Sequence, residues 1–581
     1  MALLKRLFSR EQPWPAHLQV WKAVDSLPED AFRCALKHMS DDAMFPGLDC
    51  ALAAAPPQWH PLIASAMAAL GRPLRLDRHV AAECWPTTWH MADVHDLALE
   101  LDEGVDDDGD CTHSRLLQAF SGFPALRSLS VEIDEDMNAS GKECGYFYSA
   151  LALHTGLTHL AVLLQSDFRT HRGCLAAAAS NFVPLRQLAR LHLEGMAIDE
   201  SDADALAEAA PQLTALTALV LKNMGVSSGG DRLTSAIASF PSLLDLQLTY
   251  GHLEHMLPAV WALTALTHLS VDFDMISGHS EAQMQLDGKD VLPLPSLENL
   301  RISAAGADVC MNADGFAVAL RGMPQLTALC LVYLDVEGSF QNLVNAIADL
   351  PKLVSLNMWG CDNRTQSWAE AAPALERMQH VKHLDVADLT APRTLRALPA
   401  LTALTALTLK GRTDDDEPCF ERLAAALTSL SSLRHLHLDR IDLSDGSTTA
   451  MSELAALSQL TKLRLGFTHL PSEAVTALAS VLPRWPLLRH VDISGNAIDG
   501  SAASAIARAL PHLTALQELS LRRCFGEGTG AGVVALVAAA NQLSSLTTLD
   551  LQHPRQPMSA ACRTALQPHL RGKQPHLSVL L

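Results

Sequence analysis

The sequence repeats one short hydrophobic phrase, L-x-x-L-x-L, from about residue 94 almost to its end. LTALTALTL at 401–409 is a near copy of LTALTALVL at 213–221 and of LTALTHLSV at 263–271. The fourth position of the phrase falls at Leu97, Leu129, Leu160, Leu191, Leu219, Leu246, Leu269, Leu300, Leu329, Leu356, Leu384, Leu407, Leu436, Leu463, Val491, Leu519 and Leu549. Sixteen steps separate residue 97 from residue 549, so these 17 copies recur about every 28 residues. The pattern indicates a repeat array rather than one compact core.

The hydrophobic period changes within each repeat. Apolar residues alternate in the phrase, which predicts a strand whose fourth and sixth residues face the core while the third, fifth and seventh face outward. Between phrases, segments such as DGSAASAIARALPHL at 499–513 carry apolar residues at helical spacing. Asp, Ser or Pro opens these segments, and Pro commonly closes them. Each repeat is therefore predicted to be strand, turn and helix.

Stacking such repeats predicts an α/β solenoid. Parallel strands stack about 4.8 Å apart, whereas packed helices need about 8–10 Å, so the array must curve with its strands on the concave face and its helices outside. Stability comes from stacking, and the two ends need caps. Two short steps, from Leu246 to Leu269 and from Leu384 to Leu407, predict units that lose much of their helix and bend the solenoid locally.

The phrase resembles the leucine-rich repeat, and its length and helices resemble the ribonuclease-inhibitor-like subclass. The resemblance covers residues 91–581, about 17 repeats plus a partial C-terminal repeat, and implies a horseshoe. In LLRHVDISGNAIDG, Asn496 occupies the family's buried asparagine position, whose side chain is implied to hydrogen-bond turn backbone along the stack. Because other repeats hold Met196, Met224, Cys361, Ile441 and Cys524 there, we do not expect a continuous asparagine ladder.

The N-terminal part does not follow the repeat. Residues 1–13 are predicted to be a tail, and SLPEDAFRCALKHM at 26–39 predicts a capped amphipathic helix within residues 14–90. One interpretation is a helical cap that shields the first repeat. The alternative is an F-box-like segment, because the leading Leu-Pro and the spaced apolar residues resemble that motif, which implies a Skp-type adaptor as partner. The residues that would contact the adaptor are Leu27, Pro28, Phe32, Leu36 and Met39.

Composition narrows the class of partner. The formal charge of −21 disfavours broad contact with nucleic acid and favours a basic or neutral protein partner. Twelve cysteines without a C-x-x-C pair favour an intracellular protein, cytoplasmic or, for a bacterial effector, in a host cytosol. No apolar run reaches the roughly 18 residues that span a bilayer, so no membrane association is expected.

The sequence offers little catalytic or metal-binding chemistry. Because it contains no Gly-rich phosphate loop, nucleophile turn or H-E-x-x-H, we expect neither an enzyme nor a bound cofactor. Cys84, His90, Asp93 and His95 match no zinc spacing and are interpreted as the junction that seals the first repeat. The acidic runs at 106–110 and 413–417 lack a calcium-loop pattern and are interpreted as solvated loops.

The outward strand positions are the functional candidates, because a curved sheet offers one long surface to a partner and because Trp, Tyr and Arg are frequent interface anchors. Tyr333 and Trp359 predict an aromatic patch flanked by Arg301 and Asp385, unless the rings only pack under a turn. Histidines recur at these positions, and the HLHLD segment at 435–439 would make the face pH-sensitive. The predicted protein-binding residues are Tyr250, Asp272, Phe273, Arg301, Tyr333, Asn357, Trp359, Asp385, His435, His437, Asp439, Arg464, Asp492 and Arg522.

Three functional hypotheses follow. The leading one is a non-enzymatic protein-protein interaction scaffold that binds a partner protein on the concave face. The second adds the F-box-like segment and makes the chain a substrate adaptor of a ubiquitin ligase. The third is a GTPase activator, on a resemblance to the Ran-activating leucine-rich repeat proteins, although those carry an acidic C-terminal tail and this chain ends HLRGKQPHLSVLL.

Overall fold

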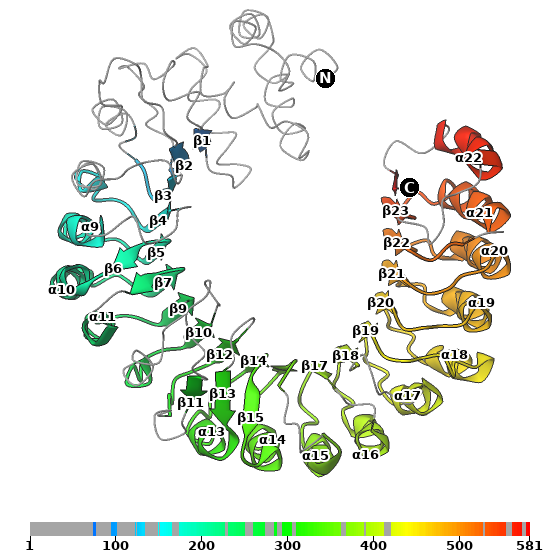
Figure 1. The fold of residues 1–581 in the computed structure, drawn as a ribbon, viewed down its shortest axis with the longest axis horizontal. Coiled ribbons are helices and arrows are strands. Elements are labelled where there is room, and N and C mark those ends of the chain that lie inside the picture. Colours follow the sequence, from blue (N-terminus) through cyan, green and yellow to red (C-terminus); the bar gives the residue numbers. More distant parts are fainter. Residues whose placement is uncertain are drawn as a thin grey trace, which may run out of the picture. The chain divides into compact units, whose positions relative to one another are not determined.

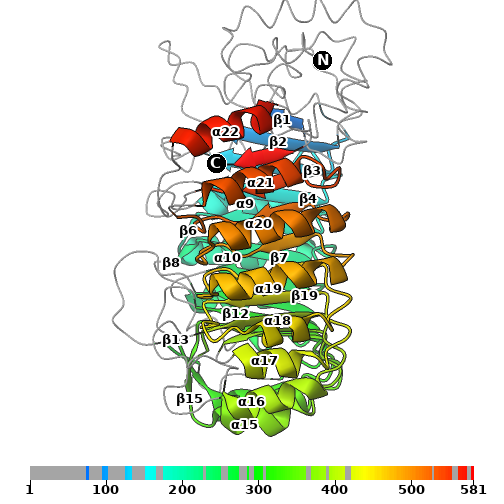
Figure 2. The same ribbon diagram turned by 90° about the vertical axis from the view of Figure 1, so that its right-hand side faces the viewer.

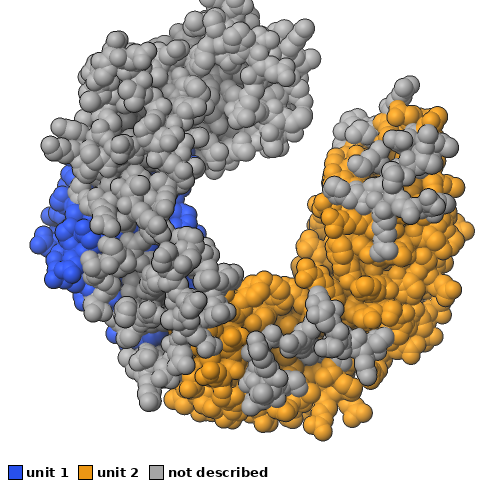
Figure 3. All heavy atoms as spheres, in the orientation of Figure 1, with its two compact units in different colours: residues 1–278 blue, residues 279–581 orange. Residues whose placement is uncertain are grey.

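The chain divides into two compact units, residues 1–278 and residues 279–581 (Figure 3). Each unit contains its own ladder of parallel strands with helices on one side of it (Figure 1). The computed structural model describes residues 74–76, 95–101, 123, 125–133, 149, 151–164, 174–226, 230–249, 260–273, 284–286, 293–304, 309–361, 368–387, 391–411, 420–526, 529–552, 560–571 and 577–580.

In the first unit each strand pairs in parallel with the strand of the next repeat, and the motif leucines meet in register, as Leu191 and Leu219 do. A short second pairing joins β6 (Ala197–Ile198) to β8 (Gly225–Val226). The described helices of this unit are α9 (Cys174–Phe182), α10 (Glu200–Ala209) and α11 (Gly230–Ala238). The ladder strands are β1 (Leu74–Leu76), β2 (Asp96–Leu101), β3 (Ser128–Ile133), β4 (His159–Leu164), β5 (Arg190–Glu194), β7 (Ala218–Lys222), β9 (Asp245–Thr249) and β10 (His268–Asp272).

The second unit continues the same alternation, and its strands line the inside of an arc (Figure 1). A smaller parallel sheet joins β11 (Met284–Leu286), β13 (Val309–Asn312) and β15 (Asp335–Glu337). The ladder strands are β12 (Asn299–Ser303), β14 (Ala328–Val332), β16 (Ser355–Met358), β17 (His383–Ala387), β18 (Ala406–Lys410), β19 (His435–Asp439), β20 (Lys462–Arg464), β21 (His490–Asp492), β22 (Glu518–Ser520), β23 (Thr548–Asp550) and β24 (Ser578–Leu580).

The helices of the second unit stack in a column, most plainly from α17 to α21 (Figure 2). They are α13 (Ala313–Leu320), α14 (Phe340–Ala348), α15 (Trp368–Leu375), α16 (Pro392–Ala397), α17 (Phe420–Leu427), α18 (Thr448–Leu454), α19 (Ser472–Val481), α20 (Gly500–Ala509), α21 (Gly530–Ala540) and α22 (Ala560–Arg571). The prediction of an α/β leucine-rich repeat solenoid, with strands and helices on opposite sides, is confirmed.

Burial follows the predicted alternation. Each of the 17 motif positions is buried, and none is more than 3% exposed. Helix starts also behave as predicted: Asp199 and Asp499 accept hydrogen bonds from the first-turn amides of α10 and α20, and Ser339 and Ser447 do so for α14 and α18. Prolines close several helices through a 3₁₀ turn, such as Leu510–His512 after α20. The local rules therefore reproduce the repeat unit.

Two regions differ from the sequence expectation or lie outside the described residues. Leu74–Leu76 forms β1 and pairs with β2, so a described strand of the ladder lies inside the segment 14–90, which was interpreted as a helical cap or an F-box-like segment. The rest of that segment and the tail 1–13 are outside the described residues. The short step from Leu384 to Leu407 keeps a helix, but α16 has only six residues.

The buried asparagine position works as the resemblance implied. Asn496 is 0% exposed. Its Nδ2 donates to the carbonyl oxygens of Leu465 (2.7 Å) and Ile493 (2.9 Å), and its Oδ1 accepts from the amide of Leu470 (2.9 Å). At the same position of other repeats, the thiols of Cys361 and Cys524 donate to backbone carbonyls 3.1 and 3.2 Å away. Thiols thus replace part of the asparagine ladder, which the sequence analysis did not foresee.

Candidate functional site

Most of the predicted binding residues lie on the outward face of the strand ladders. In β17 and β19 the first, third and fifth residues are exposed or half-buried while the second and fourth are buried. The side chains that occupy outward strand positions, or the turn directly after a strand, are Asp272, Arg301, Tyr333, Asn357, Trp359, Asp385, His435, His437, Asp439, Arg464, Asp492 and Arg522. Their role in binding stays a prediction, because exposure alone does not identify a partner.

Two residues of the predicted set do not belong to that described face. Tyr333 and Phe467 hold the same position of their repeats and are exposed with a left-handed backbone, whereas Phe273 lacks that conformation and is 3% exposed. This finding corrects its assignment to the outward set. Tyr250 lies outside the described residues, as do Leu27, Pro28, Phe32, Leu36 and Met39.

Tyr333, Trp359 and Lys410 form a cluster on the strand face of the second unit, which we call the aromatic cluster. The Tyr333 and Trp359 rings meet edge to face with their centroids 4.2 Å apart, and the Tyr333 amide donates to the Trp359 carbonyl at 2.9 Å. Lys410 Nζ lies 3.9 Å from the Trp359 ring centroid, within cation–π range. Tyr333 remains 41% exposed. The predicted contact between the two rings is present, and their role as a binding patch stays a prediction.

The repeat explains why Lys410 reaches Trp359. The outward position that follows Trp359 in the next repeat is Ala387, and Ala387 pairs with Lys410 in the repeat after that. Because alanine ends at its Cβ, the lysine side chain can extend across one strand to the indole. Lys410 was not among the predicted residues, although the seventh motif position of three successive repeats holds Trp359, Ala387 and Lys410.

The backbone of the aromatic cluster is strained at Tyr333. Tyr333 adopts a left-handed conformation with φ +58°, which costs a non-glycine residue about 1 kcal/mol or more. A Cβ added at Gly360 would lie 3.0 Å from Tyr333 Cδ1, so the glycine makes room for the ring. The exposed ring is therefore held in one orientation by the Trp359 ring, its own backbone hydrogen bond and Gly360.

Asp385 lies beside this cluster in the next strand, where Asn357 pairs with it. Burial raises the pKa of the Asp385 carboxyl above its usual value, and the nearby Lys410 opposes that shift. Among the described residues nothing hydrogen-bonds to its Oδ1, which is buried. Arg301, predicted to flank the cluster on the other side, places a guanidinium nitrogen 3.4 Å from the Cys330 sulfur. The site thus combines an exposed tyrosine ring, a half-buried indole, one lysine and a carboxylate that is costly to ionise.

Histidines and cations occupy the neighbouring strands β19 to β21. His437 pairs in register with Arg464, which pairs with Asp492. Burial lowers the pKa of His437 below its ordinary value, Arg464 and Lys410 lower it further, and Asp439 and Asp492 oppose them. Burial lowers the pKa of His435 as well, with Lys462 next in effect. The predicted pH-sensitive segment therefore lies among fixed positive charges.

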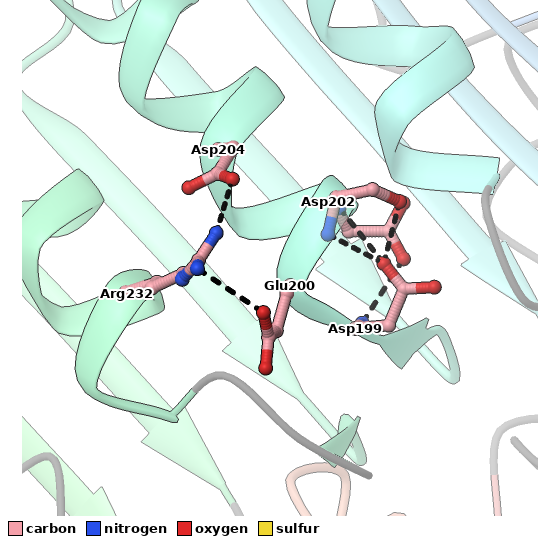
Figure 4. A network of polar contacts seen from close by, with 6 residues as sticks. Asp199, Glu200, Asp202, Asp204 and Arg232 are labelled. Carbon is pink, nitrogen blue, oxygen red and sulfur yellow. Dashed lines mark hydrogen bonds and ion pairs between the residues drawn. The ribbon is translucent and has the colours of Figure 1, made fainter.

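The helix side of the first unit contains a different polar network (Figure 4). Asp202 is 0% exposed, and its side chain accepts from the Ala176 amide at 2.6 Å, joining α10 to α9. Arg232 on α11 makes ion pairs with Glu200 and Asp204 of α10, and these side chains are at least 50% exposed. These contacts link consecutive repeats and offer no cleft, so we interpret them as structural.

The remaining candidates provide no metal site in the described part of the chain. No group of three or more His, Cys, Asp and Glu side chains that could hold a metal is found there. His95 Nδ1 lies 2.9 Å from the Ala125 carbonyl oxygen of the next repeat, whereas Cys84, His90 and Asp93 lie outside the described residues, as do both acidic runs. Among the helices described, none has the length and apolar character needed to cross a membrane.

Comparison with known proteins finds other repeat-containing chains. No protein-family model matches the sequence. NACHT, LRR and PYD domains-containing protein 5 of Homo sapiens is 31% identical over 137 residues, which cover 23% of this chain and only 11% of that protein. Among solved structures, TLR13 in its complex with ssRNA13 gives a TM-score of 0.42 and 19% identity over 80% of this chain and 62% of that one. An LRR protein of Leptospira interrogans gives a TM-score of 0.38 and 16% identity, and the match covers 84% of this chain and 96% of that one.

Proposed function

We propose that this leucine-rich repeat chain is a non-enzymatic scaffold that binds a partner protein on the strand face of its repeats. The observation that carries the proposal is the aromatic cluster, where Tyr333 is 41% exposed although its backbone is strained. Exposed aromatic rings that are held rigidly lose little conformational freedom when a partner covers them, which makes them effective anchors. Leucine-rich repeats alone support binding in general, so the partner has to be found by experiment.

The test uses the full-length chain to capture proteins from the source cell, followed by mass spectrometry. Tyr333→Gly removes the ring and suits the left-handed backbone, so this variant is expected to stay folded. Val318→Ser is the matched control, because Val318 is 64% exposed on α13 of the helix side. We expect proteins that are retained by the wild type and by Val318→Ser to be lost from Tyr333→Gly. Equal retention by all three would overturn the proposal.

The ubiquitin-ligase adaptor keeps this strand face and adds the F-box-like resemblance of Leu27 and Pro28. A double Leu27→Ala and Pro28→Ala variant of the full chain should lose a Skp-type protein while it keeps the partners of the strand face. Identical capture by both chains would leave residues 14–90 as a cap. The GTPase-activator alternative is tested by adding the chain to small GTPases, and unchanged GTP hydrolysis would remove it.

A further inference from the structure

The strand face from β17 to β22 is cationic, although the whole chain carries a formal charge of −21. Among the described residues, these strands and the residues that flank them contain nine Lys and Arg and four Asp and Glu, a formal charge of +5 with histidines neutral. The cations are Lys382, Lys410, Arg434, Arg440, Lys462, Arg464, Arg489, Arg522 and Arg523, and the acids are Asp385, Asp439, Asp492 and Glu518. We call this surface the cationic band.

Comparable strands elsewhere in the described chain do not share this charge. From β3 to β10, considered in the first unit alone, the same positions hold three cations and four carboxylates: Arg127, Arg190 and Lys222 against Glu132, Glu194, Asp245 and Asp272. Around β12, β14 and β16 they hold one of each sign, Arg301 and Glu298. The positive charge of the strand face is therefore concentrated in six consecutive repeats of the second unit.

The repeat brings these charges close together. Neighbouring parallel strands lie about 4.8 Å apart, and register pairs Lys410 with Asp439 and His437 with Arg464. The electrostatic influence of both Lys410 and Arg464 on His437 shows that the cations share one neighbourhood. A ligand that lies across β18 to β21 would meet the cations of these four repeats: Lys410, Arg434, Arg440, Lys462, Arg464 and Arg489.

Several cations of the band are not neutralised by their neighbours. Among the described residues, Arg440, Arg464 and Arg522 form no ion pair, although Asp492 is the register partner of Arg464. Phe467 adds an apolar contact in the same band: it follows β20, is 45% exposed and has φ +57°. Unpaired guanidinium groups beside an exposed ring favour a ligand that carries carboxylates.

We propose that an acidic segment of a partner protein docks along the cationic band. The inference rests on the proposed function and specifies the chemistry of its partner. At physiological ionic strength charges are screened beyond about 8 Å, so a short acidic segment responds to the band and little to the negative remainder of the chain. A long nucleic acid would extend past the band onto strands whose described charges nearly balance, so it would find no further cationic surface there. Charge complementarity therefore favours the polypeptide.

The test measures fluorescence anisotropy of a labelled peptide of alternating Glu and Ser with the full-length chain at physiological salt. Arg464→Gln with Arg522→Gln removes two charges from the band. Arg393→Gln with Arg508→Gln is the control, because it removes the same charge from exposed positions on α16 and α20 of the helix side. We expect the band variant to bind about tenfold more weakly and the control to stay within about twofold of the wild type.

Other outcomes overturn the inference. Absence of binding to the wild type, or equal weakening by both variants, means that the band is not a specific site. Tighter binding of oligouridylate than of the Glu-Ser peptide, lost in the band variant, assigns the band to nucleic acid. If Tyr333→Gly still releases captured proteins that the Glu-Ser peptide cannot displace, the proposed function stands and only the acidic partner is rejected.

Discussion

Asn496→Ala tests whether a single buried amide holds the C-terminal repeats together. The substitution removes the only hydrogen-bond acceptor that the described residues offer the Leu470 amide. A buried donor left without a partner costs about 1–3 kcal/mol. The carbonyls of Leu465 and Ile493 keep second donors, the Thr468 hydroxyl and the Cys524 thiol. Each of these carbonyls loses one bond of about 0.5–1.5 kcal/mol.

The sum predicts a loss of about 2–6 kcal/mol in the free energy of unfolding, a large part of the stability of an ordinary domain. Urea unfolding measures it, and hydrogen exchange at the Leu470 amide localises it. Cys361→Ala is the matched control, because it removes one thiol–carbonyl bond at the same repeat position and should cost about 1 kcal/mol. The reasoning is refuted if Asn496→Ala costs no more than this control and leaves exchange at Leu470 unchanged.

Three further predictions concern charge. Burial raises the pKa of Asp385, so the ionised carboxylate destabilises the folded state increasingly as the pH rises above the ordinary value of 3.8. The free energy of unfolding of Asp385→Asn in urea at pH 7 should therefore equal or exceed that of the wild type, and clear destabilisation would contradict this. Burial lowers the pKa values of His435 and His437, so below about pH 6.5 the unfolded chain binds more protons than the folded chain. The urea midpoint should therefore decrease as the pH is lowered from 7.5 to 5.5, and it should decrease less in a variant in which both histidines are replaced by Gln. Arg232→Ala should cost less than about 1 kcal/mol in thermal unfolding, because both its ion pairs are exposed; a larger loss would show that the network of Figure 4 supports the stack.

The fold was predictable because one local rule is repeated. Every motif leucine needs the same neighbour one repeat away, so an error in one copy is corrected by the others, and even Val491 occupies its expected place. The structure differs from the prediction at features that the repeated phrase does not specify. The three residues of β1 carry no full motif, and the thiol of Cys524 was not expected to donate in place of an amide.

The candidate site was predictable only in part, because its contacts run across repeats. Tyr333 and Trp359 were paired from the alignment of adjacent units, but Lys410 was not, since its reach depends on the small side chain of Ala387 between them. Phe273 shows the opposite error: the motif register placed it among the outward residues, whereas its side chain is buried in the core. Side-chain size in the intervening repeat decides which residues meet.

The charge of the strand face also depends on which residues the stacked repeats bring together. A total of −21 is a property of the whole sequence, whereas a partner meets the residues that stacking brings into one row. For example, Arg440 and Phe467 are 27 residues apart in sequence, but they occupy the same left-handed turn position of successive repeats and therefore belong to one row. Summed along the strand face, the second unit turns positive over β17 to β22, while the first unit stays nearly balanced. For a solenoid, the charge that predicts a partner is therefore the charge of a row of strands, and the acidity of the whole chain alone would have concealed the band.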